Sequence, residues 1–169
     1  MLLQKLHLTG SDNFSSLNTV IYTSPLPNHR LMKQSPDVPD SYRRSLAGID
    51  YTSPVCKINV AVNKLPNFLA DPNTEDDRPE PHHQCTIHLN CERTDIIDEA
   101  YQAARRGGYS QTPMIEMVIP SSLDPTLAPP GHHVCLLFTQ YVPYKLASGE
   151  WDEDAKADYA NVVFDNIER

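Results

Sequence analysis

The chain has 169 residues, with 14 Lys or Arg against 22 Asp or Glu, so its formal net charge is −8. That length is enough for one domain with a hydrophobic core. The acidic balance argues against a nucleic-acid partner, because such a protein presents a basic patch. No apolar run approaches the roughly 18 residues of a membrane helix, so no membrane span is expected.

Cysteine usage and the first residues bear on the compartment. Four cysteines are too few for a disulfide scaffold, so reduced thiols inside the cell are expected. The opening residues MLLQKLHLTG resemble neither a secretory signal nor a transit peptide. The 15 prolines against 6 glycines predict stiff connections between elements.

The first quarter of the chain predicts a hairpin and a short helix. A strand is expected at Val20–Tyr22, ended by the prolines that follow it, with the hairpin turn in the polar stretch 9–16. Asp40 or Ser41 as N-cap and Gly48 as stop predict a helix around 41–47.

Two alternating stretches follow, separated by an acidic segment. Ile58, Val60 and Val62 fall on one face of a half-buried strand in CKINVAVN. Residues 69–83 are acidic and rich in proline, which predicts a solvated loop and the segment most prone to disorder. QCTIHLNC resumes alternation, with Cys85 and Cys91 expected on the buried face.

The best helix in the sequence lies at 94–106. Thr94 or Asp95 caps it, and Gly107 and Gly108 end it. An apolar stripe at helical spacing runs along it. The stripe residues are Ile97, Ala100, Tyr101 and Ala104.

Strands at 114–119 and 133–142 flank the loop SSLDPTLAPPGHH, and a helix closes the chain. That last helix reaches Arg169 without a stop signal, as expected for a chain cut out of something longer. Both faces of strand 133–142 are largely apolar. Either the strand is central and covered on both sides, which we favour, or it is covered on one side and lines an apolar ligand cavity on the other.

The order of elements over residues 57–169 is strand–strand–helix–strand–strand–helix. Loops of about a dozen residues suit antiparallel neighbours. We therefore predict an α+β fold, with a mostly antiparallel or mixed sheet and helices packed on one face.

A metal site is considered and not favoured. On a strand, residues six apart lie about 20 Å apart, so Cys85 and Cys91 cannot share an ion. One route remains, in which His83 and Cys85 meet a histidine of a neighbouring strand. The residues weighed are His82, His83, Cys85, His88, Cys91, His132 and His133.

No nucleophile or cofactor motif is recognised. Ser121 and Ser122 lie in a loop without a GxSxG elbow or an obvious oriented histidine, and His132 and His133 are weak candidates for a general base. There is no GxGxxG and no other glycine-rich turn after a strand. Catalytic residues are therefore unknown, and neither cofactor-binding nor metal-binding residues are expected.

Long stretches of the chain nevertheless resemble one family. They are SPVCKINVAVNKLPNFLADPN, PHHQCTIHLNCE, MVIPSSLDPTLAPPGHHVCLLFTQYVPYKLASG and WDEDAKADYANVVFDNIE. These resemble the pyridine nucleotide-disulfide oxidoreductase domain-containing protein 2 family, relatives of phytoene desaturases in the flavin amine-oxidase superfamily. The match covers residues 53–169, and TVIYTSPLP extends it loosely into residues 1–52.

The resemblance implies that residues 53–169 are part of a substrate-binding domain and that residues 1–52 are a partial hairpin and linker on the FAD-domain side. It further implies an FAD-dependent oxidoreductase of the mitochondrial matrix, linked to respiratory function, that acts on an apolar small molecule. Full-length relatives hold FAD with glycine-rich motifs that this chain lacks, so no FAD is expected here and activity of the chain alone is doubtful. Two alternatives stay open, a non-enzymatic module that binds a mitochondrial respiratory-chain protein and a small His/Cys metal-binding protein.

Overall fold

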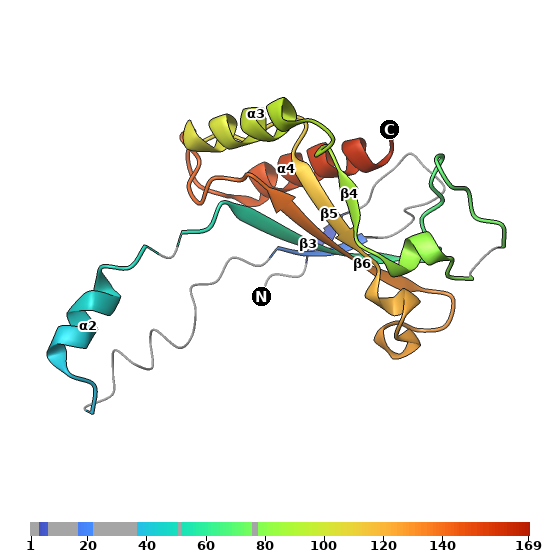
Figure 1. Ribbon diagram of the computed structural model, residues 1–169, viewed down its shortest axis with the longest axis horizontal. Coiled ribbons are helices and arrows are strands. Elements are labelled where there is room, and N and C mark those ends of the chain that lie inside the picture. The colour runs from blue at the N-terminus through green and yellow to red at the C-terminus, as the bar shows by residue number, and fades with distance from the viewer. Residues whose placement is uncertain (1–3, 7–16, 22–36, 51, 76–77) are drawn as a thin grey trace. The chain divides into compact units, whose positions relative to one another are not determined.

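A computed structural model describes residues 4–6, 17–21, 37–50, 52–75 and 78–169 (Figure 1). The chain divides into two units, one of residues 1–22 with 54–169 and the other of Thr23–Ser53. The second unit contains helix α2 (Asp40–Ala47), which confirms the helix predicted around 41–47. Gly48 ends it, with its backbone N–H donating to the carbonyl of Arg44 at 3.2 Å.

The first unit is built on a six-stranded sheet in which every pair of neighbouring strands is antiparallel. The strand order is β1-β2-β3-β6-β5-β4. The predicted antiparallel sheet is therefore confirmed. The strands are β1 (Gln4–Leu6), β2 (Leu17–Ile21), β3 (Val55–Val62), β4 (Ile87–Leu89), β5 (Met114–Val118) and β6 (His133–Gln140).

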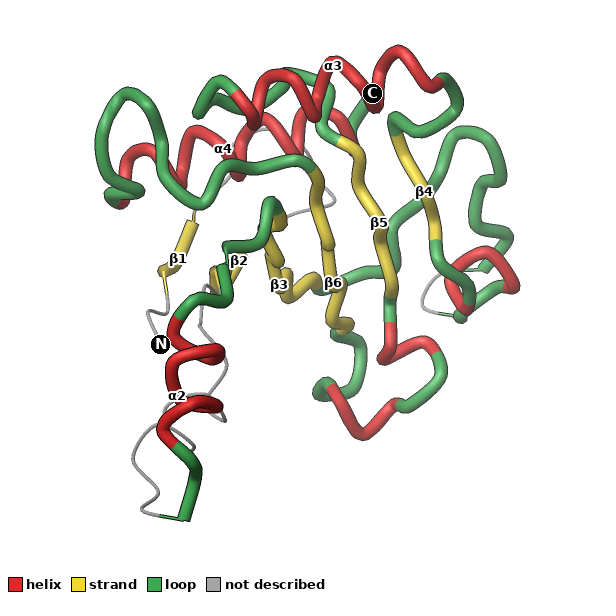
Figure 2. The backbone as a smooth tube through the Cα atoms, turned by 60° about the vertical axis from the view of Figure 1, so that its left-hand side comes forward, coloured by secondary structure: helices red, strands yellow, loops and turns green. Residues whose placement is uncertain are grey.

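Two helices cover one face of this sheet, α3 (Thr94–Arg105) and α4 (Glu153–Ile167) (Figures 1 and 2). The strands alternate between buried and more accessible residues, which is the burial pattern of a sheet covered on one side. Helices on one face of an antiparallel sheet define the α+β class, as predicted.

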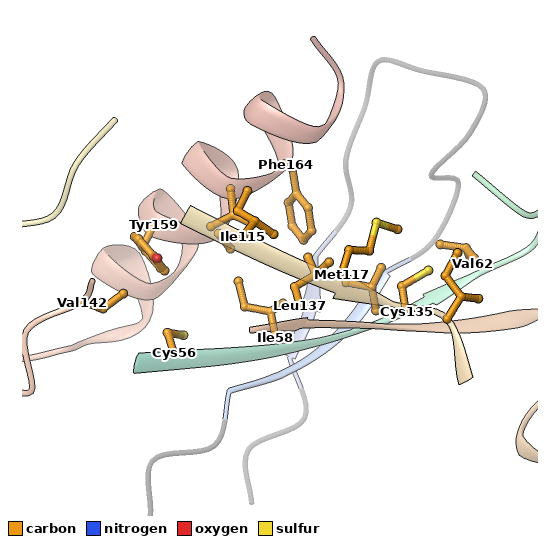
Figure 3. Packing of buried hydrophobic residues seen from close by; sticks show 14 of the residues in the cluster. Cys56, Ile58, Val62, Ile115, Met117, Cys135, Leu137, Val142, Tyr159 and Phe164 are labelled. Atoms are coloured by element: carbon orange, nitrogen blue, oxygen red, sulfur yellow. The ribbon is translucent and has the colours of Figure 1, made fainter. Parts of the chain in front are cut away.

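The core lies between this face and α4 (Figure 3). Ile58, Ile115 and Leu137 from three neighbouring strands are at most 1% exposed, and Tyr159 of α4 packs with them. At the start of α4, the Asp152 carboxylate accepts a hydrogen bond from the Ala155 backbone N–H at 2.8 Å. The remaining core residues are Cys56, Val60, Val62, Leu65, Met117, Ile119, Cys135, Val142, Ala160, Val163 and Phe164.

Helix α3 departs in part from its predicted stripe. Ala100 is fully buried, but Tyr101 is 44% exposed, with its ring against Tyr141. Beyond the helix, Gly107 has φ +77°, and a Cβ there would lie 2.7 Å from the Cβ of Ala147. Only glycine allows this turn to approach residues 146–148 so closely.

The loop from Pro120 to His132 joins two neighbouring strands, as predicted. It is wound into two short 3-10 turns, Pro120–Ser122 and Pro125–Leu127. The Asp124 carboxylate accepts hydrogen bonds from the backbone N–H and the hydroxyl of Thr126, at 3.0 and 2.6 Å. Gly131 takes φ +70°, the conformation expected of the turn glycine.

The segment before β4 differs from its prediction. A 3-10 helix, Pro81–Gln84, replaces the start of the expected strand because prolines crowd this part of the chain. Cys85 is therefore exposed and Cys91 is half-buried, so placing both in the core was wrong. The acidic loop before them is held by hydrogen bonds, among them Thr74 to Glu80 at 2.6 Å and Asn73 to Asn67 at 2.8 Å.

Candidate functional site

The face of the sheet away from the helices carries a set of side chains that we call the open face. Leu136, adjacent to the buried Leu137, is half-buried, and Phe138 is 39% exposed. The interpretation that strand 133–142 is covered on both sides is thus wrong for the described residues. The open face comprises Val55, Lys57, Asn59, Ala61, His88, Met114, Glu116, Val118, Val134, Leu136, Phe138 and Gln140.

The strand register arranges these residues in rows. Phe138 lies between Lys57 of β3 and Glu116 of β5. His88 of β4 continues this row beyond Glu116. In the adjacent row, Leu136 lies between Asn59 and Val118. Residues directly opposite on antiparallel strands have Cβ atoms about 5 Å apart, so each row is a line of touching side chains.

Glu116 is the unusual residue of the open face. It is half-buried among Met114, Val118 and Phe138, and its carboxylate makes no hydrogen bond or ion pair with any described residue. Asn59 adds a second unfilled acceptor, because its Oδ1 is buried without a hydrogen-bond partner. A buried acceptor without a donor costs free energy, so Asn59 Oδ1 is an unsatisfied group of this face.

Two of the histidines weighed as metal ligands, His82 and His83, make contacts within the loop that precedes β4. Both ring nitrogens of His83 are hydrogen-bonded, Nδ1 to the Glu80 backbone N–H at 3.0 Å and Nε2 to the Pro66 carbonyl at 2.9 Å. The His82 ring packs against it at a tilt of 50°, with ring centroids 4.0 Å apart, and its Nδ1 lies 2.9 Å from the Asp71 carboxylate. Together they fold the acidic loop back onto itself.

Ser121 and His133, by contrast, are brought together although the sequence showed no oriented histidine. Ser121 Oγ lies 3.4 Å from His133 Nδ1 and accepts a hydrogen bond from the Val134 backbone N–H at 3.0 Å. Both residues are less than 10% exposed. The contact anchors the loop to β6, and the Ser121 hydroxyl is buried.

Metal and membrane features can be judged over the described ranges. There, no three His, Cys, Asp or Glu side chains come together as metal ligands would. His132 is exposed and hydrogen-bonded to the Pro130 carbonyl, while His133 is buried. None of the helices in these ranges combines the length and the apolar character that crossing a bilayer requires.

Two cysteines of the covered face are held neutral. Burial raises the pKa of the Cys56 and Cys135 thiols to about 12. Beside Cys56, the Tyr159 hydroxyl donates to Thr139 Oγ1 at 2.7 Å, and Thr139 donates to the Cys56 carbonyl at 3.0 Å. Burial likewise raises the pKa of Tyr159. The described groups around Cys56 are thus buried, and the Thr139 and Tyr159 hydroxyls are hydrogen-bonded.

The described residues do not fit a flavin. A pyrophosphate cradle needs glycines at a turn from a strand into a helix. Gly107 follows a helix, and a glycine is needed there because Ala147 packs closely against it. Gly131 lies in a loop between two strands, with open space around it. Helix α3, which follows β4, begins after Glu92 and Arg93 rather than after glycine.

A shallow hollow of about 500 Å³ lies at the C-terminal end of α3. It is formed where the residues after the helix meet the turn at 146–148, and Arg106, Tyr109 and Gln111 give it polar groups. Its existence follows from the Gly107 contact described above. No described residue there is left with an unfilled buried polar atom.

The fold thus defines a class, an α+β segment in which helices cover one face of an antiparallel sheet. A relative from Mus musculus named "Pyridine nucleotide-disulfide oxidoreductase domain-containing protein 2" is 49% identical over 164 residues, 95% of this chain and 28% of the relative. The protein of the same name from Rattus norvegicus is 51% identical over 152 residues, 88% of this chain and 26% of the relative.

These matches confirm the resemblance seen in the sequence. The chain is related, over nearly all of its length, to a part of the pyridine nucleotide-disulfide oxidoreductase domain-containing protein 2 family. It spans little more than a quarter of the length of these relatives. The chain matches no protein-family model and no solved structure.

Proposed function

We propose that this chain is the substrate-domain part of a flavin-dependent oxidoreductase of the phytoene-desaturase type, and that its open face forms one wall of an apolar substrate cavity. The observation that carries the proposal is the asymmetry of the sheet. Helices cover one face, while Leu136, Phe138 and Val118 stay accessible on the other. Cavities for small apolar molecules are lined by such side chains.

The similarity to proteins named as oxidoreductase domain-containing supports the reaction class. The share of those relatives that lies outside the match leaves room for a flavin-binding region, which the described residues here do not supply. In the longer protein this chain would shape the cavity, exclude water from it and orient the substrate. The flavin would be held by that other region.

Flavin content tests the proposal that flavin is held by a region of the longer protein outside this chain. The Mus musculus relative should release about one flavin per chain on denaturation, measured by absorbance and fluorescence of the supernatant. The 169-residue chain, purified in the same way, should release none. Stoichiometric flavin in the short chain would contradict the proposal that flavin is held outside it.

Binding of an apolar ligand tests whether the open face forms a wall of a substrate cavity. Leu136→Lys places an ammonium group among the apolar side chains of the open face and should weaken binding of 1-octanol by tenfold or more in calorimetric titration. Leu127→Lys is the matched control, because Leu127 is 50% exposed in the loop outside the sheet. Equal octanol binding by the two variants would remove the open face from the proposal.

Location and partners are proposed from the family resemblance alone. We place the longer protein in the mitochondrial matrix, with a respiratory-chain protein as a partner of its surface. Fractionation of mitochondria with protease protection tests the location, and recovery in the cytosol would contradict it.

A further inference from the structure

The open face contains a charge that its surroundings do not explain. Glu116 lies on β5 between Met114 and Val118, and its cross-strand neighbours are Phe138 and His88. It is half-buried, yet no hydrogen bond or ion pair joins its carboxylate to another described residue. A carboxylate in partly apolar surroundings is costly without a donor.

The nearby charged groups do not satisfy it. Lys57 stands on the far side of Phe138, two strands away, which is roughly 10 Å at about 4.8 Å per strand. His88 is directly opposite but exposed, and it makes no hydrogen bond or ion pair with Glu116. Glu116 is therefore half-buried, partly accessible to solvent, and without a protein partner among the described residues.

A second acceptor lies on the other side of the same apolar strip. The Oδ1 atom of Asn59 is buried without a hydrogen-bond partner, in the row of Leu136. Glu116 and Asn59 thus flank Leu136 and Phe138, one on each neighbouring strand. Because the Asn59 Oδ1 atom is buried, Glu116 is the acceptor of the two that remains partly accessible.

We propose that Glu116 is the specificity-determining residue of this wall, and that it selects an apolar molecule carrying a hydrogen-bond donor, a hydroxyl or an ammonium group. The inference rests on the proposed function, since it assigns a ligand chemistry to the same face. The apolar body of the ligand lies on Leu136, Phe138 and Val118. Its donor reaches the Glu116 carboxylate, and molecules ending in a carboxylate are rejected by like charge.

Three probes with the same eight-carbon body test the assignment on the 169-residue chain. They are 1-octanol, octylamine and octanoate, titrated calorimetrically below their micellar concentrations. Octanol and octylamine should bind at least tenfold more tightly than octanoate. The ratio of octylamine to octanol affinity tells whether the donor read by Glu116 is charged or neutral.

Two variants locate the selectivity. Glu116→Gln removes the charge and keeps an acceptor, so octylamine affinity should fall about tenfold, octanol affinity should change by less than threefold, and octanoate affinity should rise. Glu99→Gln is the matched control, because Glu99 is exposed on α3. It should leave all three affinities unchanged.

The outcomes separate the two proposals. If the three probes bind with equal affinity, or if Glu116→Gln leaves the affinities unchanged, the role of Glu116 is overturned, but ligand binding at the open face is not. If none of the probes binds, both ligand binding at the open face and the role of Glu116 are overturned. A thermal melt of each variant shows that the fold is intact.

Discussion

The two faces of the sheet differ in how far their side chains are buried and in whether their polar groups are paired. On the covered face, Leu137 and Ile115 are at most 1% exposed, and the buried Thr139 and Tyr159 hydroxyls are hydrogen-bonded. On the open face, Phe138 is 39% exposed, and Glu116 has no described partner. On the first face, apolar side chains are packed and the Thr139 and Tyr159 hydroxyls are paired. On the second face, apolar and charged side chains stay accessible, as they do on surfaces that bind another molecule.

The largest difference should appear between adjacent leucines of β6. Leu137→Ala removes a fully buried side chain and should lower the free energy of unfolding by about 2–5 kcal/mol. Leu136→Ala, one residue earlier and half-buried, should cost less than about 1.5 kcal/mol. Urea denaturation followed by circular dichroism measures both. Similar losses for the two variants would mean that the faces do not differ in energy.

A smaller effect is expected from the polar link inside the covered face. Tyr159→Phe deletes the hydroxyl that donates to Thr139 Oγ1, leaving that buried atom with one hydrogen bond fewer. The loss should be about 1–2 kcal/mol in the free energy of unfolding. Tyr144→Phe, at a tyrosine that is 47% exposed, is the control and should be neutral. A neutral Tyr159→Phe would show that the link does not stabilise the core.

The smallest effect concerns pH. Cys56 and Cys135 have folded pKa values of about 12, raised by burial from an ordinary value of 9.0. Between these values the unfolded chain has lost thiol protons that the folded chain keeps, so stability falls as pH rises above about 9. Cys135→Ala should reduce this slope, whatever its effect on stability at pH 7. A slope unchanged by the substitution would contradict the raised thiol pKa.

Much of the fold could be predicted from local patterns. Alternation in CKINVAVN identified the buried residues of β3, and the capping and glycine signals around α3 and α2 gave those helices to within a residue or two. These signals succeed because each depends on a few adjacent residues. The prediction that Cys85 is buried was wrong because the prolines before it turn the chain into a 3-10 helix and shorten the strand.

The candidate site was harder to predict, because it depends on register between distant strands. Sequence alone showed that both faces of β6 are apolar, but not which face the helices cover. Glu116 was missed entirely. One signal was present, since MIEMV places a single charge between apolar residues on one face of a strand. Its lack of a partner emerges only when β4 and β6 are laid beside β5.

Side-chain methyl spectra test the contrast between the faces most directly. The chain, labelled with ¹³C at Leu, Val and Ile methyl groups, is titrated with 1-octanol. We predict that the methyl signals of Leu136, Val118 and Val134 shift with ligand concentration, while those of Leu137, Ile115 and Val60 stay in place. Shifts confined to the second group, or spread equally over both, would contradict the assignment of one face to folding and the other to binding.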